Sequence, residues 1–302
     1  IVDAFGTLVC GALDDACGCR ATLSVHDMGF YADIAFGGSV GAAASYMRGD
    51  WTASDLTALI RIMARNRDVL IGMEGGTAFV SGLVTRLLYW LHRNTRKGSR
   101  RNIVAHYDLG NDFFSLFLDE TMMYSSAVFT REGMSLEDAS REKAERICRK
   151  LALTPDDHLL EIGTGWGAMA IHAASAYGCR VTTTTLSDEQ YEYTRGRVRD
   201  EGVEDRITLL KKDYRDLEGT FTKAVSIEMI EAVGREYYDA YFGTVSRLLS
   251  EDGVFLIQAI IIDDRNFEDA AGRVDFIKHF VFPGSCIPSI TAMIDSVTRV
   301  AM

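Results

Sequence analysis

The chain has 302 residues, of which 47% are hydrophobic and 25% charged, a composition typical of folded globular proteins rather than disordered ones. Its formal net charge of −11 argues against nucleic-acid binding, because a phosphate backbone would be repelled. The sequence has no run of about 18 apolar residues that would indicate a transmembrane helix. Its cysteines and histidines lack the spacing of zinc ligands, so no metal site is predicted.

The first hundred residues are predicted to form a small α+β domain. Two short β-like stretches, a turn and two helices are expected, in this order: Ala21–Val25, Tyr31–Phe36, Gly37–Gly38, Val40–Met47 and Ser54–Asn66. Ser54 is the predicted N-cap of the second helix, because its hydroxyl can accept a hydrogen bond from a backbone N–H of the first turn. No catalytic group of residues is recognisable in this part.

A basic stretch from His92 to Arg101 contains five Lys or Arg residues and no acid. One interpretation is a solvated linker. The other is contact with an anionic membrane, where each Lys or Arg near the surface contributes about 1 kcal/mol. We predict two domains: residues 1–100, a membrane-associated domain with this basic linker, and residues 101–302, which carry the chemistry.

From about residue 140 the sequence alternates helical and strand-like segments. The predicted strands are His158–Ile162, Arg180–Leu186, Ile207–Lys211, Lys223–Ile227 and Val254–Ile261. The predicted helices are Arg141–Leu151, Ala168–Ala176 and Asp188–Glu201. Strands separated by helices predict a parallel sheet with right-handed crossovers, and therefore a doubly wound α/β fold.

A glycine-rich run, Leu159–Gly167, lies across the end of the first predicted strand. Glycines at this point allow the backbone to pass close to a ligand, and the following helix presents free N–H groups. Together with Ala168, the run also satisfies the dinucleotide-binding pattern GxGxxA. The motif therefore indicates a nucleotide-like cofactor and leaves a dinucleotide and an adenosyl cofactor both open.

The ends of the next strands offer further polar side chains. Thr185 and Gln190 can hold ribose hydroxyls in place of the usual acid, although both also suit a purely structural role. After the third strand, Tyr214 can stack on adenine and Asp213 can accept from its amino group; alternatively, they are ordinary loop residues. Ser226–Glu231 closes the fourth strand with two carboxylates directed towards the crevice where such sheets bind ligands. Because a buried acid costs desolvation unless paired, we interpret these as functional.

Taken together, these segments resemble the cyclopropane fatty acid synthase family, which includes the mycolic acid cyclopropane synthases. The segments that carry the resemblance are His106–Phe114, Phe117–Phe129, Glu161–Gly167, Thr185–Ser187 with Gln190, Asp213–Asp216, Ser226–Glu231 and Phe282–Ser289. Tyr31–Trp51 also resembles the N-terminal domain of the bacterial enzymes. The resemblance implies a Rossmann-like class I methyltransferase that forms cyclopropane rings on unsaturated acyl chains of membrane phospholipids.

The resemblance also implies a set of residues for each role. Those expected to bind S-adenosyl-L-methionine are Tyr124, Ser125, Glu161, Gly163, Gly165, Gly167, Thr185, Gln190, Asp213, Tyr214 and Arg215. Those expected to take part in catalysis are Glu231, Gln258, Ser126 and Tyr107. Glu231 matches an acid that helps to hold a bicarbonate ion, the implied base. Gln258 stands where many members have His, and Ser126 where a cysteine is frequent.

The chemistry explains the aromatic residues. Methyl transfer to an alkene leaves a carbocation, which needs aromatic faces and the exclusion of water. The candidates for these faces are Tyr107, Phe113, Phe114 and Tyr124.

The resemblance further implies a cytoplasmic enzyme that is peripheral at a phospholipid membrane surface, and it is compatible with a homodimer. Family members continue beyond a segment like Ile290–Met302, so we expect a C-terminally truncated fragment that is poorly soluble or inactive alone. Two alternatives stay open. One is a C-methyl or N-methyl transferase of the same fold without ring closure, and the other is an inactive membrane-binding fragment.

Overall fold

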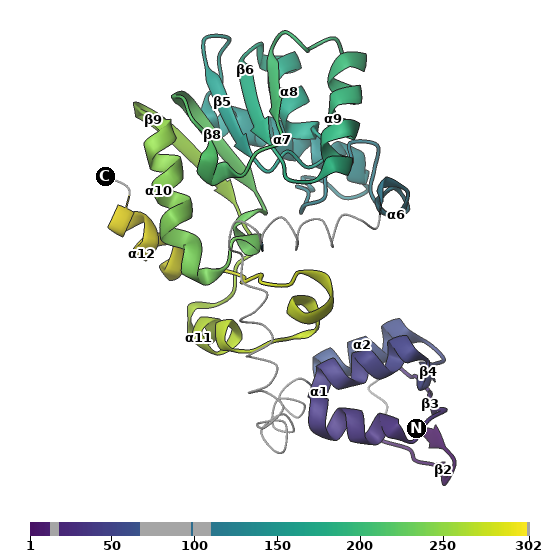
Figure 1. Ribbon diagram of the computed structural model, residues 1–302. Helices are drawn as coiled ribbons and strands as arrows, with labels where there is room; N and C mark the ends of the chain where they lie inside the picture. Colours follow the sequence, from purple (N-terminus) through teal and green to yellow (C-terminus); the bar gives the residue numbers. More distant parts are fainter. Residues whose placement is uncertain (13–17, 67–97, 99–109, 301–302) are drawn as a thin grey trace. The chain divides into compact units, whose positions relative to one another are not determined.

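The computed structural model describes residues 1–12, 18–66, 98 and 110–300, which fall into two compact units (Figure 1). The first unit comprises Ile1–Leu91 with Arg273–Val281, and the second comprises His92–Gly272 with Phe282–Met302. Tyr107 and all of the basic stretch except Gly98 lie outside the described residues. Their predicted roles stay predictions.

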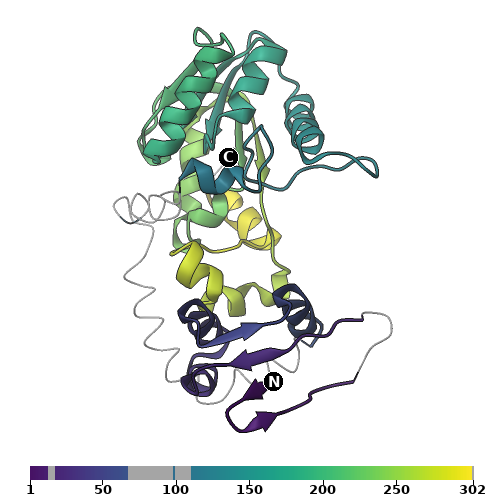
Figure 2. The same cartoon turned by 90° about the vertical axis from the view of Figure 1, so that its right-hand side faces the viewer.

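The first unit contains a small mixed sheet with the strand order β2-β1-β3-β4. Its elements are β1 (Val2–Asp3), β2 (Gly6–Thr7), β3 (Leu23–Val25), α1 (Gly29–Arg48), β4 (Trp51–Ala53), α2 (Leu56–Arg65) and a π-helical turn at Ile277–Val281. Leu23, Phe30 and Trp51 form its buried core. Figure 2 shows the short strands beside α1 and α2, which both contact β4.

Two predictions for the segment that forms α1 are wrong. Tyr31–Phe36 is not a strand but part of α1. The ring of Phe30 lies 5.9 Å from that of Trp51, so burial of the helix against the sheet outweighs the strand preference of aromatic residues. The Gly37–Gly38 turn does not end a helix either, because Gly38, at φ 55° and ψ −138°, only kinks α1.

The N-cap of α2 is Asp55 rather than the predicted Ser54. The Asp55 side chain accepts a hydrogen bond from Ala58 N at 2.9 Å. Ser54 Oγ instead accepts from Thr22 N, also at 2.9 Å, and so joins the loop before β3 to the helix start. Serine and aspartate cap helices about equally well, so the sequence alone could not separate the two adjacent positions.

The second unit contains a five-stranded parallel sheet with the order β7-β6-β5-β8-β9. The strands are β5 (His158–Ile162), β6 (Arg180–Thr184), β7 (Ile207–Leu210), β8 (Phe221–Ile227) and β9 (Leu249–Gln258). The helices are α6 (Asn111–Ser115), α7 (Leu136–Leu151), α8 (Ala168–Tyr177), α9 (Asp188–Asp200), α10 (Tyr238–Leu248), α11 (Asp264–Gly272) and α12 (Ile290–Val300). The predicted α/β fold is confirmed, and the five predicted strands are present, four of them with shifted ends.

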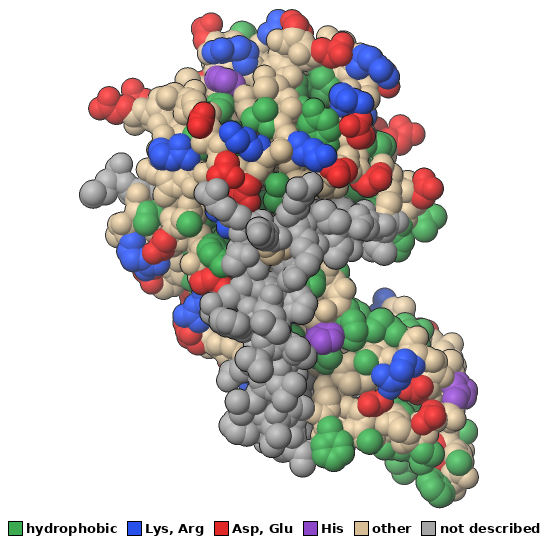
Figure 3. Space-filling model, in the orientation of Figure 1, with side chains coloured by type: hydrophobic (Ala, Val, Ile, Leu, Met, Phe, Trp, Pro, Cys, Tyr) green, Lys and Arg blue, Asp and Glu red, His purple; other side chains and the backbone are tan. Residues whose placement is uncertain are grey.

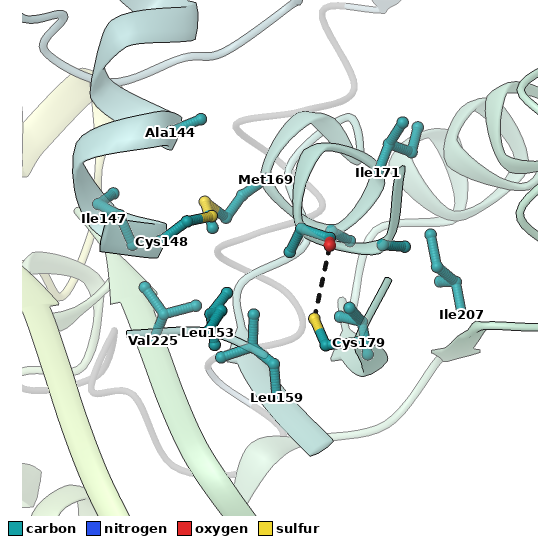
Figure 4. Close-up of a cluster of buried hydrophobic side chains, with 14 of the residues drawn as sticks. Ala144, Ile147, Cys148, Leu153, Leu159, Met169, Ile171, Cys179, Ile207 and Val225 are labelled. Carbon is teal, nitrogen blue, oxygen red and sulfur yellow. Dashed lines mark hydrogen bonds between the residues drawn. The ribbon is translucent and has the colours of Figure 1, made fainter. Parts of the chain in front are cut away.

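Helices cover both faces of this sheet. Successive strand residues point to opposite faces, so neighbouring residues of one strand pack against different helices. Leu159 belongs to a buried cluster with α7 and α8, whereas Leu160 belongs to a second cluster with α10. Figure 4 shows the first cluster, in which Cys148 and Cys179 lie among aliphatic side chains. Both thiols are buried and free.

The connections from β5 reverse direction within the sheet: β6 follows on one side, and β8 lies on the other. In open parallel sheets, ligands bind outside the carboxyl ends of the strands at this switch point. The ends of β5 and β8 are therefore where the site should lie.

Candidate active site

The loop between β5 and α8 requires glycine because of its backbone and its neighbours. Gly163 has φ 100° and Gly167 has φ 87°, which L side chains rarely adopt. A Cβ on Gly167 would lie 2.7 Å from Thr194 Cγ2 on α9. The loop is anchored to β6, since Gly163 N and Thr164 N donate to Thr184 O at 3.2 and 3.0 Å. It therefore packs tightly on its own structure and offers its other side to a ligand.

The buried carboxyl group of Glu161 is linked to this loop by hydrogen bonds. Glu161 is only 2% exposed and accepts a hydrogen bond from Thr183 Oγ1 at 2.6 Å. Thr183 Oγ1 also lies 2.7 Å from Thr164 Oγ1, which links the acid to the loop. Burial raises the pKa of Glu161 to about 8, so the group is mostly neutral at pH 7. We call Glu161, Thr164, Thr183 and the loop glycines the glycine-loop cluster.

Thr185 and Gln190, predicted to hold ribose, lie together at the start of α9. Thr185 Oγ1 donates to Gln190 Oε1 at 2.8 Å and accepts from Ser187 N at 3.1 Å. Gln190 Nε2 is buried and has no hydrogen-bond partner among the described residues. Thr185 therefore orients Gln190, whose amide is the donor left for a ligand hydroxyl or carboxylate.

The three residues predicted around adenine form one bonded group after β7. The Arg215 guanidinium binds the Asp213 carboxylate through two hydrogen bonds, at 2.8 and 2.7 Å, and Arg215 N also donates to it. Tyr214 packs on Tyr241 with ring centroids 5.5 Å apart, and burial raises its pKa to about 12. The position of the Asp213 carboxyl is therefore fixed by its neighbour.

The predicted aromatic faces fall into different environments. Phe114 is 1% exposed and packs on Trp166 at 4.8 Å, so it belongs to a core rather than to a ligand surface. Tyr124 is 38% exposed and meets Phe114 edge-on at 5.2 Å. Burial, with the nearby charge of Glu228, raises its pKa. Phe113 is exposed. Tyr124 is thus the described aromatic residue that best fits the predicted role.

A second polar group lies where β8 and β9 end. Glu228, directly after β8, accepts hydrogen bonds at Oε1 from Ser126 N and Gln258 Nε2, both at 2.8 Å. Gln258 Nε2 also donates to Ser126 O at 3.1 Å. The structure thus brings together Ser126 and Gln258 around Glu228, one of the two carboxylates that we interpreted as functional without a specific role.

Glu231 lies one turn further along the chain, in a 3₁₀ turn at Ile230–Ala232. Its Oε1 accepts from Ile260 N at 2.5 Å, whereas its Oε2 is buried without a partner among the described residues. Burial raises the pKa of Glu231 to about 7, and the charge of Glu228 adds to this shift. We call Ser126, Glu228, Glu231 and Gln258 the strand-end cluster.

Lys143 on α7 is a site residue that the sequence reasoning missed. It is 1% exposed, and its Nζ donates to Ser125 Oγ at 2.5 Å and to Ser125 O at 3.3 Å. Burial lowers its pKa to about 8, although the charges of Glu228 and Asp119 act against this shift. A signal existed, because Lys143 falls four residues before the apolar Ile147 and so shares its face of the helix.

The two clusters are neighbours. Met229, the residue after Glu228, lies against the glycine loop, since a Cβ on Gly163 would be 3.3 Å from Met229 Cγ. A separate cavity of about 160 Å³ lies near α7 and α8, lined by Arg141, His172 and others. None of the predicted site residues lines that cavity, so we place the candidate site where the two clusters meet, at the carboxyl ends of β5 and β8.

Three further features concern metal ligands, membrane spans and surface charge. In the part of the chain that the structure describes, no group of three or more acidic, Cys or His side chains could hold a metal ion. Likewise, none of the described helices is long and apolar enough to cross a membrane. Acidic and basic side chains are interspersed over the face of the second unit seen in Figure 3, as is usual for a solvated surface.

The strand order and the glycine loop define the fold of class I S-adenosylmethionine-dependent methyltransferases, and solved structures share it. The mycolic acid cyclopropane synthase CmaA1, complexed with SAH and CTAB, has a TM-score of 0.61 and is 33% identical; the match covers 66% of this chain and 73% of that one. The cyclopropane synthase MmaA2 from Mycobacterium tuberculosis also has a TM-score of 0.61, with 30% identity over 67% of this chain and 74% of its own.

Sequence comparisons give the family. The mycolic acid cyclopropane synthetase family matches residues 94–302. The cyclopropane-fatty-acyl-phospholipid synthase of Escherichia coli is 35% identical over 279 residues, 91% of this chain and 69% of the relative. The tuberculostearic acid methyltransferase UfaA1 of Mycobacterium tuberculosis is 37% identical over 276 residues, 85% of this chain. The chain belongs to this family, as predicted, and spans 61% of the length of UfaA1.

The two implied small molecules differ in how well they fit the site. The unpartnered Gln190 amide and the close-packed glycine loop suit an adenosyl cofactor. Bicarbonate does not fit. The Ser126 N–H and both hydrogens of the Gln258 amide are already engaged, and Ile260 N is engaged by Glu231. A bicarbonate ion placed there would lie beside the carboxyl groups of Glu228 and Glu231, and the N–H donors that could bind it are already engaged.

Proposed function

We propose that this protein transfers the methyl group of S-adenosylmethionine to a double bond in an unsaturated acyl chain of a membrane phospholipid, and that a cyclopropane ring results. The meeting point of the glycine-loop and strand-end clusters carries this proposal, because the glycine-rich loop lies there beside two carboxyl groups at the strand ends. The cofactor would supply an electrophilic methyl group on a sulfonium.

The residues of the chain have separate tasks in this proposal. The glycine loop and Gln190 bind and orient the cofactor, and Tyr124 offers an aromatic face to the positive charge that develops on the acyl chain. An alkene is a weak nucleophile, so alignment with the methyl group at near-attack distance supplies much of the rate. The acids at the strand ends then take up a proton. No step uses bicarbonate.

The names of the relatives support acyl-chain chemistry. One relative is a cyclopropane-fatty-acyl-phospholipid synthase, and UfaA1 is a tuberculostearic acid methyltransferase. We therefore propose an acyl substrate presented at a membrane surface, with the protein peripheral to it. The identity with UfaA1 favours a second candidate, methylation of the acyl chain without ring closure.

A vesicle assay tests both candidates. The protein is incubated with methyl-labelled S-adenosylmethionine and unsaturated phosphatidylglycerol vesicles, and the lipids are then extracted. We expect labelled acyl chains that gain one methylene per double bond, with cyclopropane protons in the proton NMR spectrum. A branch methyl or methylene without ring protons would favour the second candidate. No label in the acyl chains would contradict both.

A further inference from the structure

The Glu228 backbone is held in a conformation that glutamate rarely adopts. Its φ is 47°, in the left-handed region that favours glycine, and such a residue costs roughly 1 kcal/mol or more. The strand pairing fixes it there, because Glu228 N donates to Gln258 O at 2.8 Å just after the Ile227–Gln258 register pair. Such backbone strain is common at functional sites, which directs attention to the contacts of the Glu228 side chain.

The side chain meets donors from two separate segments. Ser126 N–H comes from the loop before α7 and the Gln258 amide from the end of β9, and both point at one oxygen, Oε1. Two N–H donors at 2.8 Å hold this oxygen in one position. The charge of the buried Lys143 also interacts with Glu228.

The second oxygen is left for other partners. Glu228 Oε2 makes no hydrogen bond to a described residue, and Glu228 is only partly exposed. Its neighbour Met229 touches the glycine loop, so Glu228 lies one residue from a contact with the predicted cofactor-binding loop. A carboxylate fixed through one oxygen, with the other unengaged, is the arrangement expected of a general base.

We infer that the Glu228 carboxylate takes the place that the family resemblance gives to bicarbonate, and is the catalytic base of this protein. Ser126 and Gln258, which the resemblance assigns to catalysis beside the ion, donate to the Glu228 carboxylate. A carboxylate and a bicarbonate ion present similar oxygen atoms to such donors. The inference rests on the proposed function, which it deepens.

The step balances without any other reactant. A carbon–carbon bond forms between the alkene and the transferred methyl group, and the sulfur keeps the electron pair of the broken bond. Glu228 Oε2 then takes a proton from that methyl group, and the electrons of the C–H bond close the three-membered ring. The protonated carboxyl returns its proton to solvent before the next turnover.

Bicarbonate dependence tests the inference. The vesicle assay is run in buffer freed of carbon dioxide, with and without added bicarbonate. We expect the wild-type rate to be the same in both. Glu228→Gly should lose about 100-fold or more without bicarbonate, the usual contribution of a general base, and regain part of the loss when the ion is added. Glu228→Gln should lose as much and gain nothing, because its amide fills the place.

The control for the loss of charge is Glu251→Gln, an exposed acid on β9, which should leave the rate unchanged. Glu228→Gly should fold, since glycine suits φ 47°, and its thermal midpoint and S-adenosylhomocysteine affinity check this. A wild-type rate that falls when bicarbonate is removed would overturn the inference. So would a Glu228→Gly rate equal to that of the wild type.

A binding measurement separates this inference from the proposed function. If the wild type labels no lipid in either buffer, the proposed function fails, but the inference is still decided by NMR with ¹³C-bicarbonate. Saturation transfer to the ion from Glu228→Gly and none from the wild type would support it. Transfer from the wild type would show that the ion has room beside Glu228, and the inference would fall.

Discussion

The glycine-loop cluster and the strand-end cluster lie at the carboxyl ends of β5 and β8, but their carboxyl groups have different partners. Glu161 has a hydroxyl donor, is almost completely buried, and is mostly neutral at pH 7. Glu228 has two N–H donors and the charge of Lys143 nearby. The first environment favours the neutral acid, and the second fixes one carboxyl oxygen through two N–H groups.

The difference separates binding from chemistry. A neutral, hydrogen-bonded acid holds the glycine loop in one shape and does not change charge when a ligand approaches. A charged carboxylate with a free oxygen can take up a proton. Substitutions in the two clusters should therefore affect different measurements: stability and cofactor affinity in the first, turnover in the second.

The largest effect is expected from Gly167→Ala in the glycine-loop cluster. The new Cβ would meet Thr194 Cγ2 at 2.7 Å in a backbone with φ 87°. We expect a loss of about 3 kcal/mol in unfolding free energy, from strain and overpacking together, and at least tenfold weaker binding of S-adenosylhomocysteine by calorimetry. Gly202→Ala is the matched control, because φ is 66° there but nothing lies within 4 Å. Equal losses for both would show that the contact with Thr194 is unimportant.

Glu161→Gln should reveal the neutral state of the first cluster. The folded pKa of Glu161 is about 8 against an ordinary 4.5, so its contribution to stability is complete below pH 4.5 and is lost as pH rises to about 8. Glutamine does not titrate. The unfolding free energy of the variant minus that of the wild type should therefore increase by about 2 kcal/mol or more as the pH rises from about 5 to about 8. Urea unfolding at several pH values measures this difference. A difference that does not change with pH would contradict a protonated Glu161.

Lys143→Met tests the charge beside the second cluster. The folded pKa of Lys143 is about 8 and its ordinary value 10.5, so the unfolded chain binds more protons between them. Wild-type stability should therefore rise relative to the variant across that interval, by about 1–3 kcal/mol in urea unfolding. Turnover at neutral pH should fall several-fold, because the Ser125 turn loses its anchor. Lys143→Gln, which keeps donors without the charge, should recover part of the turnover only.

The smallest effect is expected from Ser126→Ala. The structure uses the backbone N–H and carbonyl of Ser126, whereas its hydroxyl makes no hydrogen bond to a described residue. Stability should change by less than about 0.5 kcal/mol, and turnover by less than about twofold. Ser126→Pro, which removes the N–H donated to Glu228, should lose most of the activity. A large loss in the alanine variant would give the hydroxyl a role that the geometry does not.

Much of the second unit was predictable from its sequence, because its strands carry clear apolar runs and its loop carries glycines. His158–Ile162 was predicted with the bounds that the structure has. The first unit was less predictable. Tyr31–Phe36 has aromatic residues typical of a strand. The segment is helical because α1 packs on Trp51, a contact that the local sequence does not reveal.

The predicted site residues were grouped correctly in part, but the partners of Ser126 and Gln258 were not foreseen. Nothing local marks Glu228 as their common acceptor, because this depends on a left-handed backbone and on residues 102 and 30 positions away. The Lys143–Ser125 contact joins a helix to an earlier loop and is likewise a property of the tertiary structure.

The buried thiols Cys148 and Cys179 can be used to measure how often the second unit opens. Burial raises the pKa of Cys148 to about 12 and that of Cys179 to about 11, so almost no reactive thiolate exists at neutral pH. Cys10, in the first unit, is exposed. An alkylating reagent should modify Cys10 at once, whereas Cys148 and Cys179 should react only when the sheet opens. Their labelling rate would report how often the catalytic unit unfolds under conditions in which it still works.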